Sequence, residues 1–260
     1  MQRGAGHPVP GRHHLHWTCR MDSMVSWLTL LGFGDKGWGD ELLRGALLSV
    51  EISISSYVLG LTLGLAGALA KLSKRRAAVY VAVVYTTIIR SVPDILIIFL
   101  VYYSATDALR SVVTLTGFTS EFQMNGFVAA TLSLGIVQGG YSTEVLRGAI
   151  TAIPRGQAEA AHALGLTRRQ TFFLVTLPQM IPLAVPGLGN LWLVVLKESS
   201  LVSLIGFTEL VLAGKMAAGA TRDYFLFYCA IAFVFLVMSG LSAMLFHALE
   251  TSTANTGRRR

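Results

Sequence analysis

The chain has 260 residues, of which 53% are hydrophobic and 13% are charged, and its mean hydropathy is +0.59. Because soluble domains carry about 25% charged residues, this composition excludes a typical soluble domain and predicts an integral membrane protein in contact with lipid. The formal net charge of +7 would suit a nucleic acid, but the basic residues gather at the ends of apolar segments. We therefore expect no nucleic-acid partner.

The first 34 residues do not read as part of a packed domain. Residues 1–20 are basic and rich in Pro and Gly, and the apolar run at 24–33 is too short and broken for a secretory signal. We expect residues 1–34 to be a disordered extension or the product of a start codon set too early. Met21 or Met24 would then be the true beginning.

Candidate metal ligands give only a weak signal. His13, His14 and His16 could bind a metal, although tails of this kind seldom do. Cys19 and Cys229 lie far apart among unlike neighbours, which indicates neither a metal cluster nor a disulfide framework. We expect no metal site on this chain.

Residues 35–250 predict an all-α membrane domain with about five transmembrane helices, followed by a basic cytoplasmic tail at 251–260. A spanning helix needs about 20 mainly apolar residues. A short interfacial helix is expected at 35–44, with Trp38 at the level of the lipid headgroups. The five apolar stretches run from about 42 to 69, 77 to 103, 127 to 145, just after 178 to 205, and 224 to 249.

The basic residues also predict the orientation in the membrane. Lys and Arg in short loops are retained on the cytoplasmic side, and they concentrate at 71–76, 147–169 and 258–260. With five spans, the N-terminus is expected outside and the C-terminus inside. The loops near 104–124 and 206–223 are then expected outside.

One polar insert, RGQAEAAHALGLTRRQTFFLVTLP at 155–178, interrupts the apolar segments. Pro154 is tolerated at a helix start, the residues after it favour helix, and Gly165 can take the left-handed conformation that closes a helix. We expect a helix of about ten residues on the cytoplasmic side. Its small side chains would suit docking in a groove of another protein.

The insert resembles the EAA loop of the membrane subunits of bacterial ATP-binding-cassette (ABC) importers. That loop reads E-A-A, three residues, Gly, nine residues, Ile-x-Leu-Pro, and this chain departs from it at Val175 in place of Ile. The resemblance implies a type I ABC importer permease fold with a cytoplasmic coupling helix. It assigns ATPase coupling to Gly156, Glu159, Ala160, Ala161, Gly165, Leu177 and Pro178.

Neighbouring segments extend the resemblance to the polar amino acid importer permeases, over roughly residues 36–250. GYSTEVLRGAI at 140–150 is similar to their A-Y-x-x-E-x-x-R-G-A-I segment, and KESSLVSLIG at 197–206 to K-D-T-S-L-V-S-x-I-G. YTTIIRSVPDIL at 85–96 looks like Y-T-T-x-I-R-G-V-P-D, which is typical of the importers of histidine, lysine, arginine and ornithine and of opines such as octopine and nopaline. The resemblance implies a cationic amino acid or an opine as substrate. Ser91 and Glu198 depart from the usual Gly and Asp.

Charged residues inside apolar stretches are candidates for the substrate pathway, because each costs about 2.5–3.5 kcal/mol at the bilayer centre. Glu198 could hold a cationic group, with the hydroxyls of Ser199 and Ser200 serving polar groups; the alternative is an ion pair with Lys197 that fixes helix register. Arg90 and Asp94, beside the kink expected at Pro93, could pair or line the pathway.

A second pair of charges, on the third apolar stretch, has a different expected role. Glu144 and Arg147 lie three positions apart, near the cytoplasmic end of that stretch. Residues three apart share one helix face. We expect them to form a structural ion pair.

The chain has no G-x-x-x-x-G-K-[ST] phosphate loop, since Gly214-Lys215 is followed by Met216 and lacks the first glycine. We therefore expect a subunit that is not an enzyme and binds no cofactor, with ATP and Mg²⁺ held by partner subunits. The resemblance implies two cytoplasmic ATP-binding subunits, a periplasmic substrate-binding protein and a second permease, usually a paralogue, in the bacterial inner membrane.

An ion-gradient-driven secondary transporter is the alternative, and a membrane scaffold or receptor is a third. A secondary transporter would be expected to carry internal inverted repeats and its own coupling site, and no repeat is visible by eye. The prolines at 154, 178, 182 and 186 suit a path lining that rearranges, or serve as packing kinks.

Overall fold

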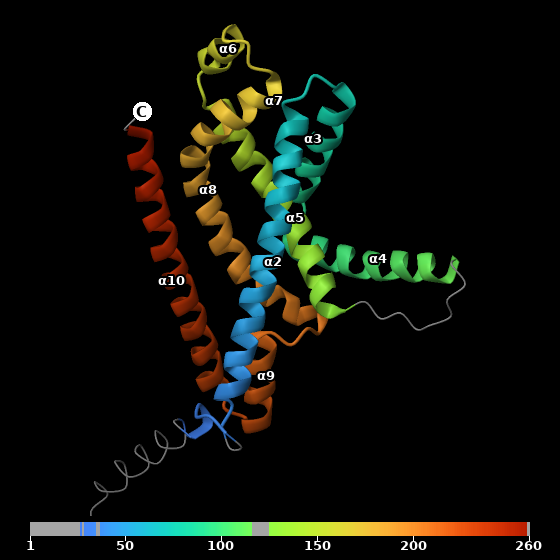
Figure 1. The fold of residues 1–260 in the computed structure, drawn as a ribbon. Coiled ribbons are helices and arrows are strands. Elements are labelled where there is room, and N and C mark those ends of the chain that lie inside the picture. Colours follow the sequence, from blue (N-terminus) through green and yellow to red (C-terminus); the bar gives the residue numbers. More distant parts are fainter. Residues whose placement is uncertain (1–26, 28, 35–36, 116–124, 259–260) are drawn as a thin grey trace, which may run out of the picture.

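The structure is a computed structural model that describes residues 27, 29–34, 37–115 and 125–258 (Figure 1). Its elements within those ranges are helical, as the composition indicated. The α-helices are α2 (Gly39–Lys71), α3 (Arg76–Ser91), α4 (Asp94–Leu115), α5 (Gly126–Thr151), α6 (Arg155–Ala163), α7 (Arg168–Thr171), α8 (Leu177–Glu198), α9 (Leu210–Thr221) and α10 (Tyr224–Arg258). A π-helical turn, η1 (Phe172–Thr176), precedes α8, and a 3₁₀ segment, η2 (Ser199–Ile205), follows it.

The two helices α2 and α5 form the centre of the molecule and pack closely against each other (Figure 1). Glycines make this approach possible. A Cβ atom at Gly60 would lie 2.5 Å from Cγ of Gln138, and one at Gly64 would lie 2.4 Å from Cβ of Ser142. Small residues four positions apart are a common means of close helix packing in membranes.

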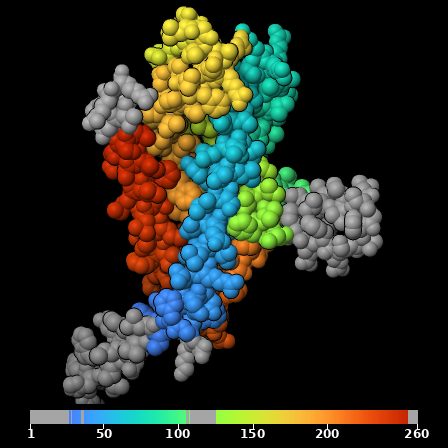
Figure 2. Space-filling view, viewed as in Figure 1, coloured from blue at the N-terminus to red at the C-terminus, as the bar shows by residue number. Residues whose placement is uncertain are grey.

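The remaining helices give the molecule two distinct ends. The helix α8 packs against α5 and α10, and α9 packs against α2 and α10. Figure 1 shows α6 and α7 at one end of the bundle, and α9 with the start of α2 at the other. In Figure 2, α10 forms one flank of the molecule, and just 6% of its apolar window is buried, so this flank is available to lipid or to a partner subunit.

Three helical segments among the described residues are long and apolar enough to cross a membrane: Gly39–Lys71, Arg168–Ile205 and Tyr224–Thr253. A fourth span is present if Arg76–Ser91 and Asp94–Ser104, bent by 117°, count as one. The expectation of five spans therefore exceeds the three or four candidates. The difference is α5, which has the length of a span but carries glycines, hydroxyl residues and Gln138 because it packs against protein.

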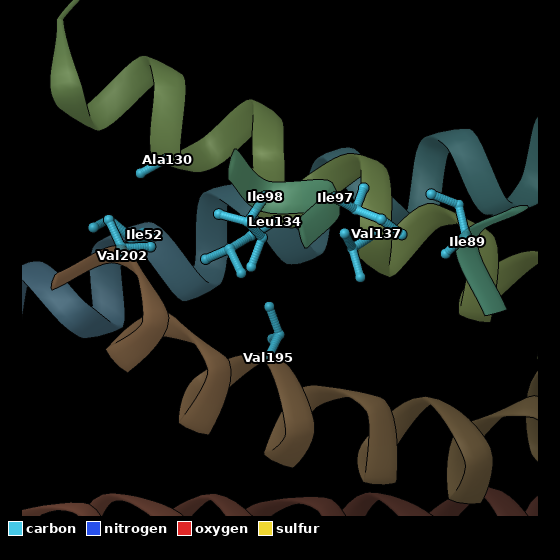
Figure 3. Packing of buried hydrophobic residues seen from close by; sticks show 9 residues of the cluster. All are labelled: Ile52, Ile89, Ile97, Ile98, Ala130, Leu134, Val137, Val195 and Val202. Atoms are coloured by element: carbon cyan, nitrogen blue, oxygen red, sulfur yellow. The ribbon is translucent and has the colours of Figure 1, made fainter. Parts of the chain in front are cut away.

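The largest apolar cluster lies where α2, α3, α4, α5, α8 and η2 meet. Figure 3 shows its nine buried residues, with Ile98, Leu134 and Val195 near the middle and Ile89 at one side. They are Ile52, Ile89, Ile97, Ile98, Ala130, Leu134, Val137, Val195 and Val202. This cluster fixes the start of α4 against α5 and α8, which positions the polar residues described below.

Several expected boundaries were wrong. The segment 35–44 is not a separate interfacial helix: from Gly39 onward it is the first part of α2, because its apolar Leu42 and Ala46 pack under α9 and α10. The expected outer loop at 206–223 contains the apolar helix α9, which is too short to span but packs in the same cluster.

The prediction of an outer loop at 104–124 was also wrong in part, because α4 continues to Leu115. At the C-terminus, α10 extends through most of the expected tail, to Arg258. The expected extension at 1–34 lies largely outside the described residues, as do its histidines and Cys19.

Candidate functional site

The insert forms the helix α6, and its ends are set by the two residues that the sequence suggested. Pro154 precedes the helix with extended backbone, φ −57° and ψ 132°. Gly165 follows it with φ +80°, and Leu166 N–H donates to Ala161 O at 3.1 Å while Gly165 N–H donates to His162 O at 2.9 Å. This is the Schellman arrangement that satisfies the last carbonyls of a helix. The ring nitrogen Nδ1 of His162 also lies 3.1 Å from Leu166 O.

Most of the predicted coupling residues are accessible on α6. Gly156, Glu159 and Ala160 are exposed, whereas Ala161 is buried against its own chain and serves the packing of the helix. Leu164, which the sequence suggested merely as a helix former, is 82% exposed.

The π-helical turn η1, within the insert, joins α7 to α8. Leu177 N–H donates to Phe172 O, five residues back, and Pro178 follows directly. Because proline has no N–H and its ring crowds the preceding turn, the wider turn accommodates it. Leu177 and Pro178 therefore set the direction in which α8 leaves the insert. The Gln179 and Gln157 side chains, 3.4 Å apart, connect α8 to α6.

Pro93 breaks the second apolar stretch instead of kinking it. Val92 is extended, with φ −101° and ψ 139°, as expected for a residue before proline, and α3 and α4 diverge by 117°. Asp94 becomes the first residue of α4. A carboxylate in the first turn is favoured by the partial positive charge of a helix N-terminus.

Asp94 meets two other polar residues at this break. The Tyr141 hydroxyl of α5 donates to Asp94 Oδ1 at 3.1 Å, and Glu198, the last residue of α8, lies within reach of a side-chain hydrogen bond to Asp94. Two carboxylates this close repel unless a proton or a cation lies between them. The arrangement can thus hold a cationic group. The sequence did not identify Tyr141 as part of this site, because its partner Asp94 is 47 positions away.

The other predicted pathway residues are arranged differently. Arg90 is exposed and forms no ion pair with Asp94 in the described part of the chain. Lys197 and Glu198 are likewise not within ion-pair distance. The hydroxyls of Ser199 and Ser200 donate to Leu196 O at 2.8 Å and Lys197 O at 2.6 Å.

An ion cluster ties three helices together near the α6 end. Glu144 Oε2 accepts from Arg147 Nε at 3.1 Å and Nη2 at 3.0 Å, so the expected structural pair is confirmed. Lys71 of α2 also binds Glu144 and donates to Thr86 Oγ1 of α3 at 2.6 Å. The sequence suggested Lys71 merely as a topology signal. Among the described residues, no group of three or more His, Cys, Asp or Glu side chains could hold a metal ion.

The family described as "Binding-protein-dependent transport system inner membrane component" matches residues 57–253. The chain belongs to this family. It is therefore a non-catalytic, multi-pass component of the inner membrane, and a transporter of this kind works with an ATPase and a binding protein.

Three relatives resemble the chain over most of its length. It is 38% identical over 222 residues to the octopine transport system permease protein OccQ of Rhizobium radiobacter, covering 85% of this chain and 94% of the relative. It is 40% identical over 233 residues to the nopaline permease protein NocQ of Agrobacterium fabrum, with coverage of 89% and 98%. It is 39% identical over 206 residues to the histidine/lysine/arginine/ornithine permease protein HisQ of Escherichia coli, with coverage of 79% and 90%.

Solved structures agree on the fold. A crystal structure of an amino acid ABC transporter with histidines superimposes with a TM-score of 0.70 at 29% identity, covering 83% of this chain and 95% of that chain. An inward-facing structure of the MetNI methionine ABC transporter gives a TM-score of 0.67 at 19% identity, which supports the fold alone. The expected importer permease fold is confirmed.

Proposed function

We propose that this permease carries a cationic amino acid or an opine. The observation that carries the proposal is the meeting of Asp94, Glu198 and Tyr141 at the break between α3 and α4. Two acidic side chains and one hydroxyl provide acceptors for an ammonium or guanidinium group. The named substrates of OccQ, NocQ and HisQ support the same class.

Arg90 belongs to the same proposal. It lies in the last turn of α3, just before the break that makes Asp94 the first residue of α4. A guanidinium there would attract the carboxylate that amino acids and opines also carry. Ser200 would contribute an acceptor, since its hydroxyl proton is directed to a backbone carbonyl. Ser199 was also predicted to line the pathway, but it is fully buried and therefore not accessible to a substrate in this structure.

Coupling to ATP hydrolysis would run through α6. The exposed Gly156, Glu159, Ala160 and Leu164 offer a docking surface, and Gly165 with Leu177 and Pro178 fixes its connection to α8. Movement of α6 would pass to α8 through the π-helical turn and reach Glu198 at the far end of that helix. Closure of the ATPases could then change access to the carboxylate pair.

The assembly would contain two cytoplasmic ATP-binding subunits, a periplasmic binding protein and a second permease that is a paralogue of this chain. The N-terminus would lie in the periplasm and the C-terminus in the cytoplasm, which places α6 inside and the start of α2 outside. This orientation agrees with the basic residues at 71–76 and in the insert.

Co-purification tests the coupling role. The permease pair and its ATPase are expressed together, and we expect the ATPase to co-elute with the unmodified chain but to be lost with Glu159→Lys or Gly165→Pro. Glu250→Lys, an equal charge change on α10, is the control and should leave the complex intact. If the ATPase stayed bound to all three variants with normal transport, α6 would not be the coupling helix.

Uptake measurements on a deletion strain test the substrate class. A strain lacking this gene is expected to lose uptake of labelled arginine, histidine or octopine, and to regain it with the gene restored. Retention of uptake for all three compounds would argue against a cationic amino acid or opine.

A further inference from the structure

Two adjacent arginines, Arg168 and Arg169, begin the apolar segment Arg168–Ile205, which is long and apolar enough to cross a membrane. They belong to α7, which Figure 1 shows at the same end of the bundle as α6. Both residues are exposed, and in the part of the chain that the structure describes neither forms an ion pair. Two guanidinium groups are therefore available to an anion at the point where a span begins.

Large apolar side chains are exposed directly after these arginines. Phe173 is 52% exposed and Leu174 is 64% exposed. The guanidinium carbon of Arg169 lies over the ring of Phe173, 6.0 Å from the ring centroid, and this cation–π contact keeps the positive charge beside the exposed ring. A cation next to exposed apolar side chains matches the two parts of a phospholipid, a phosphate and an acyl chain.

The backbone that carries the arginines is fixed by a capping box. Thr167 N–H donates to Gln170 Oε1 at 2.9 Å, and Gln170 N–H donates to Thr167 Oγ1 at 3.4 Å. Thr171, the last residue of α7, is buried. The arginines are thus presented on an ordered turn, which lowers the entropy that is lost when they bind a ligand.

We propose that Arg168, Arg169, Phe173 and Leu174 form a binding site for an anionic phospholipid. Its phosphate pairs with the two guanidinium groups, whose N–H donors match phosphate oxygens, and an acyl chain covers the two apolar side chains. A lipid fits this surface better than an acidic protein does, because Phe173 and Leu174 belong to a segment with the length and hydropathy of a membrane span.

The site lies at a junction that matters for the motion of the permease. The turn η1 contains Phe173 and Leu174 and joins α7 to α8. A lipid bound here therefore anchors the start of α8 at the membrane surface. This inference goes beyond the proposed transport function and does not depend on which substrate is carried.

Native mass spectrometry of the complete transporter tests the site. The transporter is purified in detergent and titrated with phosphatidylglycerol or, in a parallel sample, with phosphatidylcholine of the same acyl chains. We expect the unmodified transporter to bind phosphatidylglycerol more tightly, and Arg168→Gln/Arg169→Gln to lower its apparent affinity for that lipid about tenfold. Arg168→Lys/Arg169→Lys keeps both charges and should retain most of the binding. Arg44→Gln/Lys215→Gln removes two exposed positive charges elsewhere and is the control.

Equal binding of the two lipids by the unmodified transporter would overturn the proposal. So would unchanged phosphatidylglycerol binding by Arg168→Gln/Arg169→Gln, or an equal loss in the control variant. Loss of the ATPase from the glutamine variant, with phosphatidylglycerol binding unchanged, would assign the two arginines to a protein contact instead of a lipid.

Discussion

The hydroxyl of Tyr141 on α5 donates a hydrogen bond to the carboxylate of Asp94 on α4, and Glu198 of α8 lies beside the same carboxylate. Three helices thus contribute one polar side chain each to a single point. The break at Pro93 makes this possible, because it turns Asp94 into the first residue of a new helix.

Neutralising either carboxylate should weaken substrate recognition. For Asp94→Asn and Glu198→Gln we expect the KM for uptake of labelled L-arginine to rise about tenfold or more, because a charge-assisted hydrogen bond is lost. The control is Glu51→Gln, an exposed carboxylate elsewhere on α2. An unchanged KM in both site variants would remove these residues from the substrate pathway.

Breaking the ion cluster of Lys71, Glu144 and Arg147 should destabilise the bundle. Glu144→Gln leaves the cations of Lys71 and Arg147 without their shared carboxylate in a partly buried place. We therefore expect a loss of about 1–3 kcal/mol in unfolding free energy. Thermal unfolding in detergent measures it. The exposed pair His247–Glu250, 4.0 Å apart, offers the comparison: Glu250→Gln should change the midpoint little. Equal effects of the two variants would contradict the structural role of the cluster.

The glycine contacts between α2 and α5 should tolerate no side chain. Gly64→Val would place a Cβ about 2.4 Å from that of Ser142, and overpacking of this kind costs about 1–3 kcal/mol or more. We expect fluorescence-detected size-exclusion chromatography to show loss of the folded peak. Gly240→Val on α10, where no atom lies within 4 Å, should retain it. A normal peak for Gly64→Val would mean that the helices are farther apart.

Glu209 should make stability depend on pH. Burial raises the pKa of Glu209 from 4.5 to about 7, against the opposing effect of its backbone hydrogen bonds. The folded state then holds the proton more tightly than the unfolded state, so stability is greatest below about pH 4.5 and falls as the pH rises to about 7. Melting temperatures between pH 4.5 and 8 should therefore decline more steeply for the unmodified chain than for Glu209→Gln. Parallel curves would contradict this.

Local features of the site were predictable, and its long-range features were not. Pro154 and Gly165 mark the two ends of α6 because of their own backbone preferences. The sequence therefore predicted this helix well. The partner of Tyr141 is on another helix, and Lys71 lies 73 positions from Glu144, so neither contact could be inferred from spacing.

The missed helix α9 has a related cause. Its 12 residues are too few for a span, and its stability depends on packing against α2 and α10 and on the cap from Glu209. The same holds for α5, whose Gly135, Gly139 and Gly140 are explained by close contact with side chains of neighbouring helices and not by lipid. Apolar periodicity detects contact with lipid better than contact with protein.

The most direct test of the central claim is uptake by proteoliposomes that contain the permease pair and its ATPase, with the binding protein outside and ATP and Mg²⁺ inside. We expect accumulation of labelled L-arginine or octopine that requires both ATP and the binding protein, and that stops with Glu159→Lys. Uptake driven by an ion gradient in the absence of the ATPase would contradict the account and identify a secondary transporter.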